Sequence, residues 1–269
     1  LKIYIFLLVL IFIGIIWADA TKERPIDWRE SYSLNEKIPF GLYVFNQEHK
    51  AIFKPQTVEK FSESPYEFLD KNYNTYDSIY DIEGTILLIQ NKAAIDEFSE
   101  NELFYFASHR NAIFYSNSNF SQKFADSLGF EIEYSNDFAD SLQFKINRNQ
   151  KAGNFYFNKG INTAYFSKID TSKTEVLGTQ INSKGEEFAN FIKVKHLNGN
   201  FYLHLQPVAF TNYYLLNKNS QYTEDILGYI PSKSPIYWKV KQYDNEELSS
   251  SPMRYLLSQP ALKWAWFLA

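Results

Sequence analysis

The sequence of 269 residues contains no cysteine. This absence excludes disulfide frameworks, zinc sites with thiolate ligands, iron–sulfur clusters and mechanisms with a cysteine nucleophile. Glycine is scarce, with 10 residues, and neither a phosphate-binding loop nor a dinucleotide fingerprint occurs. The string G-x-S-x-G is also missing, which argues against a serine hydrolase of the α/β type. We therefore predict no catalytic residue and no cofactor, and expect the protein not to be an enzyme.

The chain also lacks a surplus of basic residues, because 27 lysines and arginines stand against 31 acidic residues and give a net charge of −4. A nucleic-acid partner is not expected, since such binding needs a basic surplus or stripe. The four histidines form no metal-binding motif, so no metal site is predicted. Hydrophobic residues make up 45% and charged residues 22%, which predicts that most of the chain folds in water.

Residues 1–17 (LKIYIFLLVLIFIGIIW) are apolar apart from Lys2 and nearly match the thickness of a bilayer core. This run predicts a transmembrane or signal-anchor segment, and Trp17 suits an interfacial anchor. Ala18-Asp19-Ala20 resembles a signal-peptidase site, so a cleaved signal peptide is the alternative. Both alternatives place the folded domain on the extracytoplasmic, periplasmic side of the cytoplasmic (inner) membrane. Because the chain begins with Leu, we also expect further residues upstream.

The rest of the chain divides by composition. Residues 18–36 are polar and predict a stalk, and residues 37–243 predict an α/β domain. Residues 244–259 predict a polar linker. Residues 260–269 carry paired tryptophans beside a lysine and predict the start of a possible second transmembrane helix, with a short helix docked on the core as the alternative.

The first part of the domain, residues 37–140, has the pattern of an α/β core. Residues 85–90, 112–115 and 130–134 are short apolar runs that predict strands, with helices over about 100–110 and up to 128 between them. Short βαβαβ connections predict a doubly wound, mostly parallel, Rossmann-like sheet.

Local signals refine this part of the prediction. Residues 41–45 (GLYVF) read as a first strand, and residues 46–53 are expected to form a helical turn or two after it. Ser64-Pro65-Tyr66-Glu67 predicts a helix start with a capping box. Helix caps are also expected at Ser99 and at Ser118 or Asn119, and a left-handed helix end is expected at Gly129.

The second part, residues 141–243, predicts a β-rich region with two short helices over 211–216 and 221–227 and a last strand over 235–240. Its clearest element is a hairpin over 191–205 with Asn198-Gly199 as the two-residue turn. Pairing outward from this turn places Ile192, Val194 and Phe201 on a core face. The opposite face, with His204, is expected to be largely wet.

The segment 210–216 (FTNYYLL) lies at a predicted strand-to-helix junction, where α/β proteins often bind ligands. We therefore consider Asn212 and Tyr213, together with His204, a possible interaction or ligand site. Structural roles, with Thr211 as a helix cap and Tyr213 as a packing residue, are the alternative.

Several motifs along the chain carry a family resemblance. They include Lys37-Ile-Pro-Phe-Gly-Leu-Tyr-Val-Phe45, Gly199-Asn-Phe-Tyr-Leu-His204, Phe210-Thr-Asn-Tyr-Tyr-Leu-Leu216 and Pro260-Ala-Leu-Lys-Trp-Ala265. In their order and spacing, the chain resembles the membrane-anchored bacterial proteins of domain-of-unknown-function family 4350. The resemblance implies a fold similar to class I glutamine amidotransferases and operon company with a MoxR-type ATPase. It implies no amidotransferase activity, because that chemistry needs a cysteine nucleophile.

These observations together predict a membrane-anchored, non-catalytic protein-interaction or scaffold component of an envelope assembly linked to a MoxR-type ATPase system. The expected partners are the membrane and a protein of that assembly. The alternative is a carbohydrate-binding or carbohydrate-cleaving envelope module that uses the aromatic residues, 18% of the chain, and paired acids. Acidic residues near predicted loops are Asp81, Glu83, Asp96 and Asp170, for which solvated loop positions are the alternative.

Overall fold

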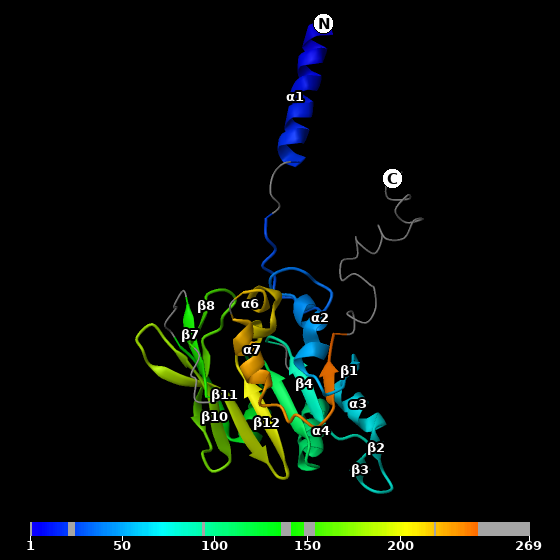
Figure 1. Cartoon of the computed structure of the whole chain (residues 1–269), viewed down its shortest axis with the longest axis vertical. Helices are drawn as coiled ribbons and strands as arrows, with labels where there is room; N and C mark the ends of the chain where they lie inside the picture. The colour runs from blue at the N-terminus through cyan, green and yellow to red at the C-terminus, as the bar shows by residue number, and fades with distance from the viewer. Residues whose placement is uncertain are drawn as a thin grey trace.

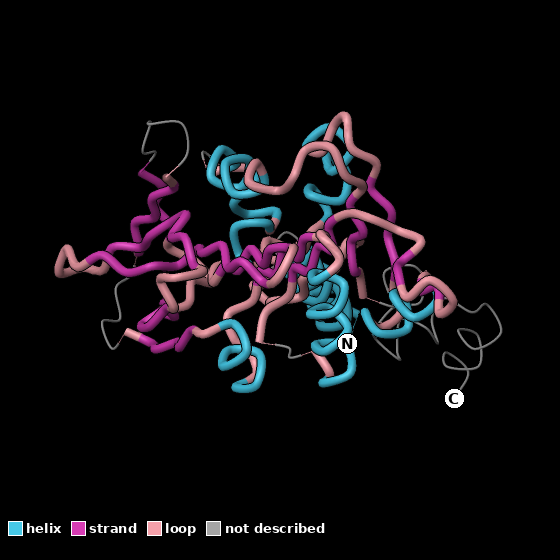
Figure 2. The backbone as a smooth tube through the Cα atoms, turned by 90° about the horizontal axis from the view of Figure 1, so that it is seen from below, coloured by secondary structure: helices cyan, strands magenta, loops and turns pink. Residues whose placement is uncertain are grey.

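The computed structural model describes residues 2–20, 25–92, 95–135, 141–147, 154–217 and 219–241. These residues form an α/β fold around a mixed sheet of eleven strands, with helices on both faces (Figures 1 and 2). A separate ribbon of two strands, β2 (Tyr73–Asn74) and β3 (Ile79–Tyr80), lies beside it. The predicted α/β class is confirmed.

One half of the sheet is parallel, as predicted. Its strands follow the order β1 (Val58–Phe61), β13 (Ile236–Lys239), β4 (Thr85–Ile89), β5 (Ala112–Ser116) and β12 (Gly199–His204), and each neighbouring pair is parallel. All residues of β4 and β5 are buried, which is the pattern of central strands covered on both faces. The two apolar runs thus mark the centre of the parallel core.

The other half is antiparallel and contains most of the β-rich region. From β12 the order continues through β11 (Glu187–His196), β10 (Thr174–Ile181), β7 (Leu142–Ile146) and β8 (Asn154–Phe157). β9 (Ala164–Ile169) also pairs with β11. The sheet is therefore mixed, rather than doubly wound throughout.

The third strand of the predicted βαβαβ unit does not join the parallel core. β6 (Phe130–Tyr134) pairs antiparallel with β9, and β12 takes the place beside β5. Along β6, only Phe130 is buried, whereas a central parallel strand is covered on both faces. The glutamates at 131 and 133 therefore suit a peripheral strand, and the predicted parallel pairing is wrong.

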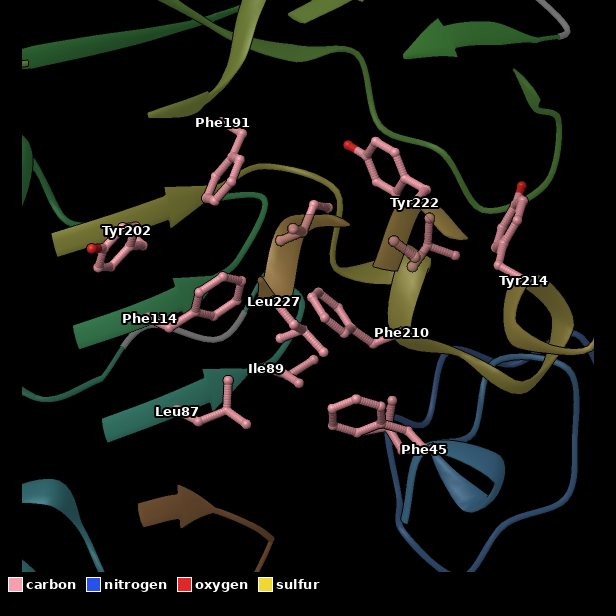
Figure 3. Close-up of a cluster of buried hydrophobic side chains, with 14 of the residues drawn as sticks. Phe45, Leu87, Ile89, Phe114, Phe191, Tyr202, Phe210, Tyr214, Tyr222 and Leu227 are labelled. Carbon is pink, nitrogen blue, oxygen red and sulfur yellow. The ribbon is translucent and has the colours of Figure 1, made fainter. Parts of the chain in front are cut away.

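Two helical layers cover the sheet and enclose two hydrophobic cores (Figure 2). The layer on one face contains α3 (Pro65–Lys71), α4 (Glu97–Ser108) and α5 (Gln122–Leu128). The layer on the other contains α2 (Tyr43–Ile52), η1 (Pro207–Phe210), α6 (Asn212–Leu215) and α7 (Ser220–Leu227). Figure 3 shows part of this second core, where Phe45 and Phe210 lie near the side chains of β4 and β5, and Tyr222 lies on the other side of the cluster.

The strand predicted over 41–45 is wrong, because these residues lead into helix α2. Phe45 and His49 are its buried residues, four positions apart, so the apolar run supplies one face of a helix. The predicted helix over 46–53 is confirmed in large part. The apolar run was too short to separate the two structures by periodicity alone.

The helix signals are confirmed in two places and displaced in two others. The capping box of Ser64 and Glu67 is present at α3, and Gly129 ends α5 with φ +75°. Helix α4 begins earlier than predicted, because Asp96 is its N-cap and accepts a hydrogen bond from the Ser99 backbone N–H. Helix α5 is capped by Ser121 rather than by Ser118 or Asn119.

The predicted hairpin is formed by β11 and β12, but its turn is shifted. His196 pairs with Gly199, so Leu197 and Asn198 form the turn. A Cβ at residue 199 would lie 2.1 Å from the carbonyl oxygen of Ala107, so glycine is required inside the strand. The shift moves the pairing by two residues, and the predicted faces are kept because side chains alternate with a period of two.

The face of the hairpin that was expected to be wet is covered only at the end away from the turn, whereas Lys195 and Leu197 are exposed. Tyr202 and His204 are both buried, because helices pack on this side of the sheet as well as on the other. The expectation that His204 is solvated is therefore wrong.

The apolar N-terminal run forms helix α1 (Lys2–Ala20). No helix within the described ranges is both long and apolar enough to cross a membrane, so the expected spanning segment is not supported. In the segment expected to be a stalk, Tyr32 and Leu34 are buried in the core. The predicted linker over 244–259 and second membrane helix over 260–269 lie outside the described residues.

Candidate functional site

The carboxyl ends of the parallel strands bring polar residues together, and such edges are where open α/β sheets commonly bind ligands. In the strand register, Ile89 of β4 lies beside Ser116 of β5, and Ser116 lies beside His204 of β12. His204 therefore lies at the edge where a site is expected, although on strand β12, which closes the parallel half.

A buried hydrogen-bonded network surrounds His204. Its Nδ1 lies 2.9 Å from Ser116 Oγ, and its Nε2 lies 3.1 Å from Tyr222 Oη. Asn190 Nδ2 donates a hydrogen bond of 3.2 Å to the same tyrosine oxygen. All four side chains are buried. The pair of Ser116 and His204 has the spacing of a nucleophile and its base, but both lie in the protein interior.

Burial determines the charge state of this network. It lowers the pKa of His204 to about 3 and raises the pKa of Tyr222, because a charge is costly in a medium of low polarity. The imidazole is therefore neutral at physiological pH. Donation from Tyr222 Oη to Nε2 and from Nδ1 to Ser116 Oγ satisfies both ring nitrogens.

Aromatic rings pack against His204 and separate the network from solvent. Phe191 and Phe210 lie 5.6 Å and 5.8 Å from the imidazole centroid, both edge to face. The hydrogen bonds of His204 are thus part of the core that Figure 3 shows around Phe191, Phe210 and Tyr222. This arrangement can fix the position of α7 against the sheet, and it leaves the imidazole no contact with solvent.

Asn212 ties the segment that precedes α2 to helix α6. Its Nδ2 donates to the carbonyl oxygens of Glu36 and Ile38 at 2.9 Å and 2.8 Å, and its Oδ1 accepts from the Val44 backbone N–H at 2.8 Å. These hydrogen bonds satisfy backbone groups that are far from Asn212 in the sequence. The amide side chain of Asn212 therefore has a structural role.

Tyr213 belongs to an aromatic cluster at the start of the domain. Its ring lies 5.4 Å from Trp28 and 6.4 Å from Phe40, and its hydroxyl donates to Asn158 Oδ1 at 3.4 Å. Thr211 is the N-cap of α6 in position, but its hydroxyl donates to the Val208 carbonyl instead of capping the helix. The hydrogen-bond partners of His204 are not shared with Asn212 or Tyr213, so these three residues form separate structural contacts.

A small cavity of about 130 Å³ lies at the ends of β4 and β13. Its lining includes Glu30, Tyr32, Gln90, Trp238 and Lys239. Tyr32 Oη is buried without a hydrogen-bond partner, and burial raises the pKa of this hydroxyl. The volume is below the range of pockets that enclose a typical organic ligand, about 300 to 1,000 Å³.

Two larger cavities lie away from this edge. One of about 670 Å³ lies between α2 and α7. The other, of about 730 Å³, lies at the amino ends of β4 and β5 and is lined by the loop before β4, the end of α4 and the hairpin turn. Neither cavity is evident from the sequence, because both are assembled from segments far apart in the chain.

The described residues contain no group of three histidine, aspartate or glutamate side chains placed to hold a metal ion. Two of the loop acids considered with the carbohydrate alternative have local roles. Asp96 caps α4, and Asp170 accepts hydrogen bonds from the Ser172 backbone and hydroxyl. Their carboxylates are held by turn and cap geometry.

No protein-family model matches the chain, and no curated protein matches it. Similar solved structures include the exo-β-1,4-mannosidase Op5Man5 from Opitutaceae bacterium strain TAV5, with 10% identity, a TM-score of 0.42, and coverage of 71% of this chain and 39% of that one. A catalytic mutant of the GH42 β-galactosidase Gan42B from G. stearothermophilus has 9% identity and a TM-score of 0.38, covering 76% and 37%. The chain thus spans less than half the length of these glycosidases.

A cytoplasmic protein from Salmonella typhimurium is also similar, with 10% identity, a TM-score of 0.32, and coverage of 64% of this chain and 70% of that one. These structural similarities are distant. No matching family model supports the resemblance to domain-of-unknown-function family 4350.

Proposed function

We propose that this chain is a non-catalytic protein-interaction module of an envelope assembly, attached by α1 to the extracytoplasmic face of the cytoplasmic membrane. The observation that carries the proposal is the surface of α1. Its exposed side chains are large and apolar in successive turns, including Phe6, Leu8, Phe12 and Trp17. A helix that is apolar all round needs cover from lipid or from another protein.

The non-catalytic part of the proposal is supported by the roles of the polar residues at the carboxyl edge. Ser116 and His204 lie within hydrogen-bond distance of each other in the core, and aromatic rings pack against His204. Asn212 bonds the backbone before α2 and in its first turn. A general base must reach the proton that it removes. An imidazole enclosed in this way is better suited to packing than to general base catalysis.

The link to a MoxR-type ATPase and the glutamine amidotransferase-like character of the fold remain part of this proposal. The parallel half of the sheet is compatible with that fold. The carbohydrate alternative gains little from the aromatic residues, because many of them, such as Phe45, Phe124 and Phe201, are buried in the two cores.

Blue native electrophoresis of gently solubilised native membranes tests the proposal. We expect the tagged full chain to migrate in a complex with another protein, and Ser116→Ala to leave this complex unchanged. Migration as a free monomer, or an enzymatic activity of the purified chain that Ser116→Ala abolishes, would contradict the proposal.

A further inference from the structure

The cavity at the amino ends of β4 and β5 has walls from three segments that are far apart in sequence. Ile79 of β3 contributes with Ile82 and Glu83 from the loop before β4, Arg110 follows α4, and Leu197 belongs to the turn between β11 and β12. The volume of about 730 Å³ is large enough to receive side chains of another molecule. We call the surface around this cavity, defined by these five residues, the amino-edge face.

Backbone strain is concentrated at the amino-edge face. Among the described residues, five other than glycine have a positive φ, and three of them lie here or directly beside it: Ser78 at 55°, Arg110 at 71° and Leu197 at 51°. This left-handed conformation is unfavourable for residues with a Cβ atom, and asparagine or glycine adopts it more easily. Strained residues of this kind are often found at functional sites.

The side chain of Leu197 contributes little to the stability of the fold, although its backbone conformation is strained. Its side chain is 67% exposed, and a two-residue hairpin turn favours asparagine or glycine at this position. Ile79, across the cavity, is 49% exposed. A leucine kept at a strained and exposed position is explained if its side chain is covered by a partner.

Charge defines the kind of partner. Glu83 of the amino-edge face is exposed, as are Asp81 in the same loop before β4 and Asp77 in the turn between β2 and β3. None of the three takes part in an ion pair within the described ranges. Arg110 is the cation of this surface and is likewise in no such pair. Three carboxylates against one guanidinium leave the rim acidic, so a basic partner is favoured.

The amino-edge face also lies far from the helix that we propose as the attachment. In Figure 1 the β2–β3 ribbon and the turn of the β11–β12 hairpin lie at the lower end of the domain, while α1 lies beyond the upper end. A domain attached through α1 would present this face away from the membrane, where a partner can reach it.

We propose that the amino-edge face docks a basic segment of a partner protein. An apolar side chain of that segment fills the cavity between Ile79 and Leu197, and its lysines or arginines lie against Asp81 and Glu83. This inference rests on the proposed interaction function and names the surface that carries it.

Fluorescence anisotropy with labelled synthetic peptides tests the proposal on the full chain. The probe peptide contains leucines and lysines in a serine–glycine background, and matched peptides replace the lysines by glutamates or the leucines by serines. We expect the leucine–lysine peptide alone to bind, with an affinity that falls as salt rises. Leu197→Asn should weaken binding at least about tenfold while the melting temperature stays equal or rises, because asparagine suits the turn.

Matched variants test whether binding depends on this surface or on charged and apolar residues anywhere on the protein. Asp81→Lys with Glu83→Lys should weaken binding by at least about tenfold, whereas Leu216→Asn and Asp126→Lys, at exposed positions outside this face, should change it less than about twofold. Equal binding by wild type and Leu197→Asn, a loss with Leu216→Asn, or binding of the glutamate peptide would overturn the docking surface. Those results would leave the proposed function standing if the native complex is still seen on blue native gels.

Discussion

At the scale of single residues, His204 shows how the same side chain can suggest chemistry in a sequence and serve packing in a fold. Its ring bonds Ser116 and Tyr222, and burial lowers its pKa to about 3. The unfolded chain binds a proton there below about pH 6.5, while the folded protein does not. Stability is therefore full above that pH and falls as the pH drops from about 6.5 towards 3.

We expect the free energy of unfolding to fall by about 1.4 kcal/mol per pH unit from His204 alone, between about pH 6 and pH 4. Burial also lowers the pKa of His49 and His196, which act in the same direction. Urea unfolding at a series of pH values measures the slope, and His204→Gln should reduce it. The NMR signal of the His204 ring should not titrate between pH 8 and pH 5, and a midpoint near pH 6.5 would contradict its burial.

Asn212 supports a second prediction at this scale. Its three hydrogen bonds to the backbone of residues 36–44 would be lost in Asn212→Ala, leaving buried donors and acceptors unpaired. We expect a loss of about 2 to 4 kcal/mol in the free energy of unfolding. The control is Asn217→Ala, an exposed amide that donates to one carbonyl, which should cost less than about 1 kcal/mol. Equal losses in the two variants would show that Asn212 does not hold this segment.

At the scale of elements, close packing of a glycine determines the register of the β11–β12 hairpin. A Cβ at Gly199 would lie 2.1 Å from the carbonyl oxygen of Ala107 and 2.2 Å from that of Asn111. No real Cβ contact is so short. A larger residue at position 199 would therefore force the strand away from the end of α4. Leu197 consequently lies in the turn, although Asn198 and Gly199 would suit it better.

Gly199→Ala should therefore lower the free energy of unfolding by about 3 kcal/mol or more, because the clash is with backbone atoms. Gly185→Ala is a matched control, since that glycine has open space around it but a φ of +81°. Its cost should be about 1 kcal/mol. Urea denaturation compares the two, and a cost at Gly199 no greater than that at Gly185 would contradict the account of the register.

Local signals in the sequence predicted individual helices and strands better than they predicted which strands pair with each other. The Ser64 capping box, the Gly129 helix end and the buried strands β4 and β5 depend on near neighbours, and the structure contains them. The run over 41–45 was ambiguous because five apolar residues fit a strand or one face of a helix.

At the scale of the whole molecule, strand order was the part that local patterns could not supply. β13, near the end of the described chain, lies between β1 and β4, and β12 separates β5 from β11. The pairings of β13 join Ile236 to Val58 and Thr85, and the pairing of β12 with β5 joins Asn200 to Ala112. The sheet order and the burial of His204 therefore follow from contacts that no sequence window contains. For the same reason the sequence did not indicate the amino-edge face, and Glu83 was considered only as a loop acid. A leucine directly before Asn198-Gly199 is a signal that can be sought.

The apolar surface of α1 leads to a prediction for the whole chain. We expect the full chain to float with vesicles of phosphatidylethanolamine and phosphatidylglycerol in a density gradient. Leu8→Asp with Phe12→Asp should reduce flotation at least about tenfold, because aspartate is costly in an apolar phase. Leu216→Asp, at an apolar position 74% exposed but outside α1, is the control. Equal flotation of all three proteins would argue against attachment through α1.

The central claim, that this domain acts by docking a partner at the end of the sheet remote from α1, is tested most directly by photo-crosslinking in native membranes. A photoreactive amino acid is placed at position 197 in one protein and at position 216 in another. We expect an adduct with a second, different protein from position 197 and none from position 216. An adduct from position 216 alone, a homodimer at position 197, or no adduct from either position would contradict the claim.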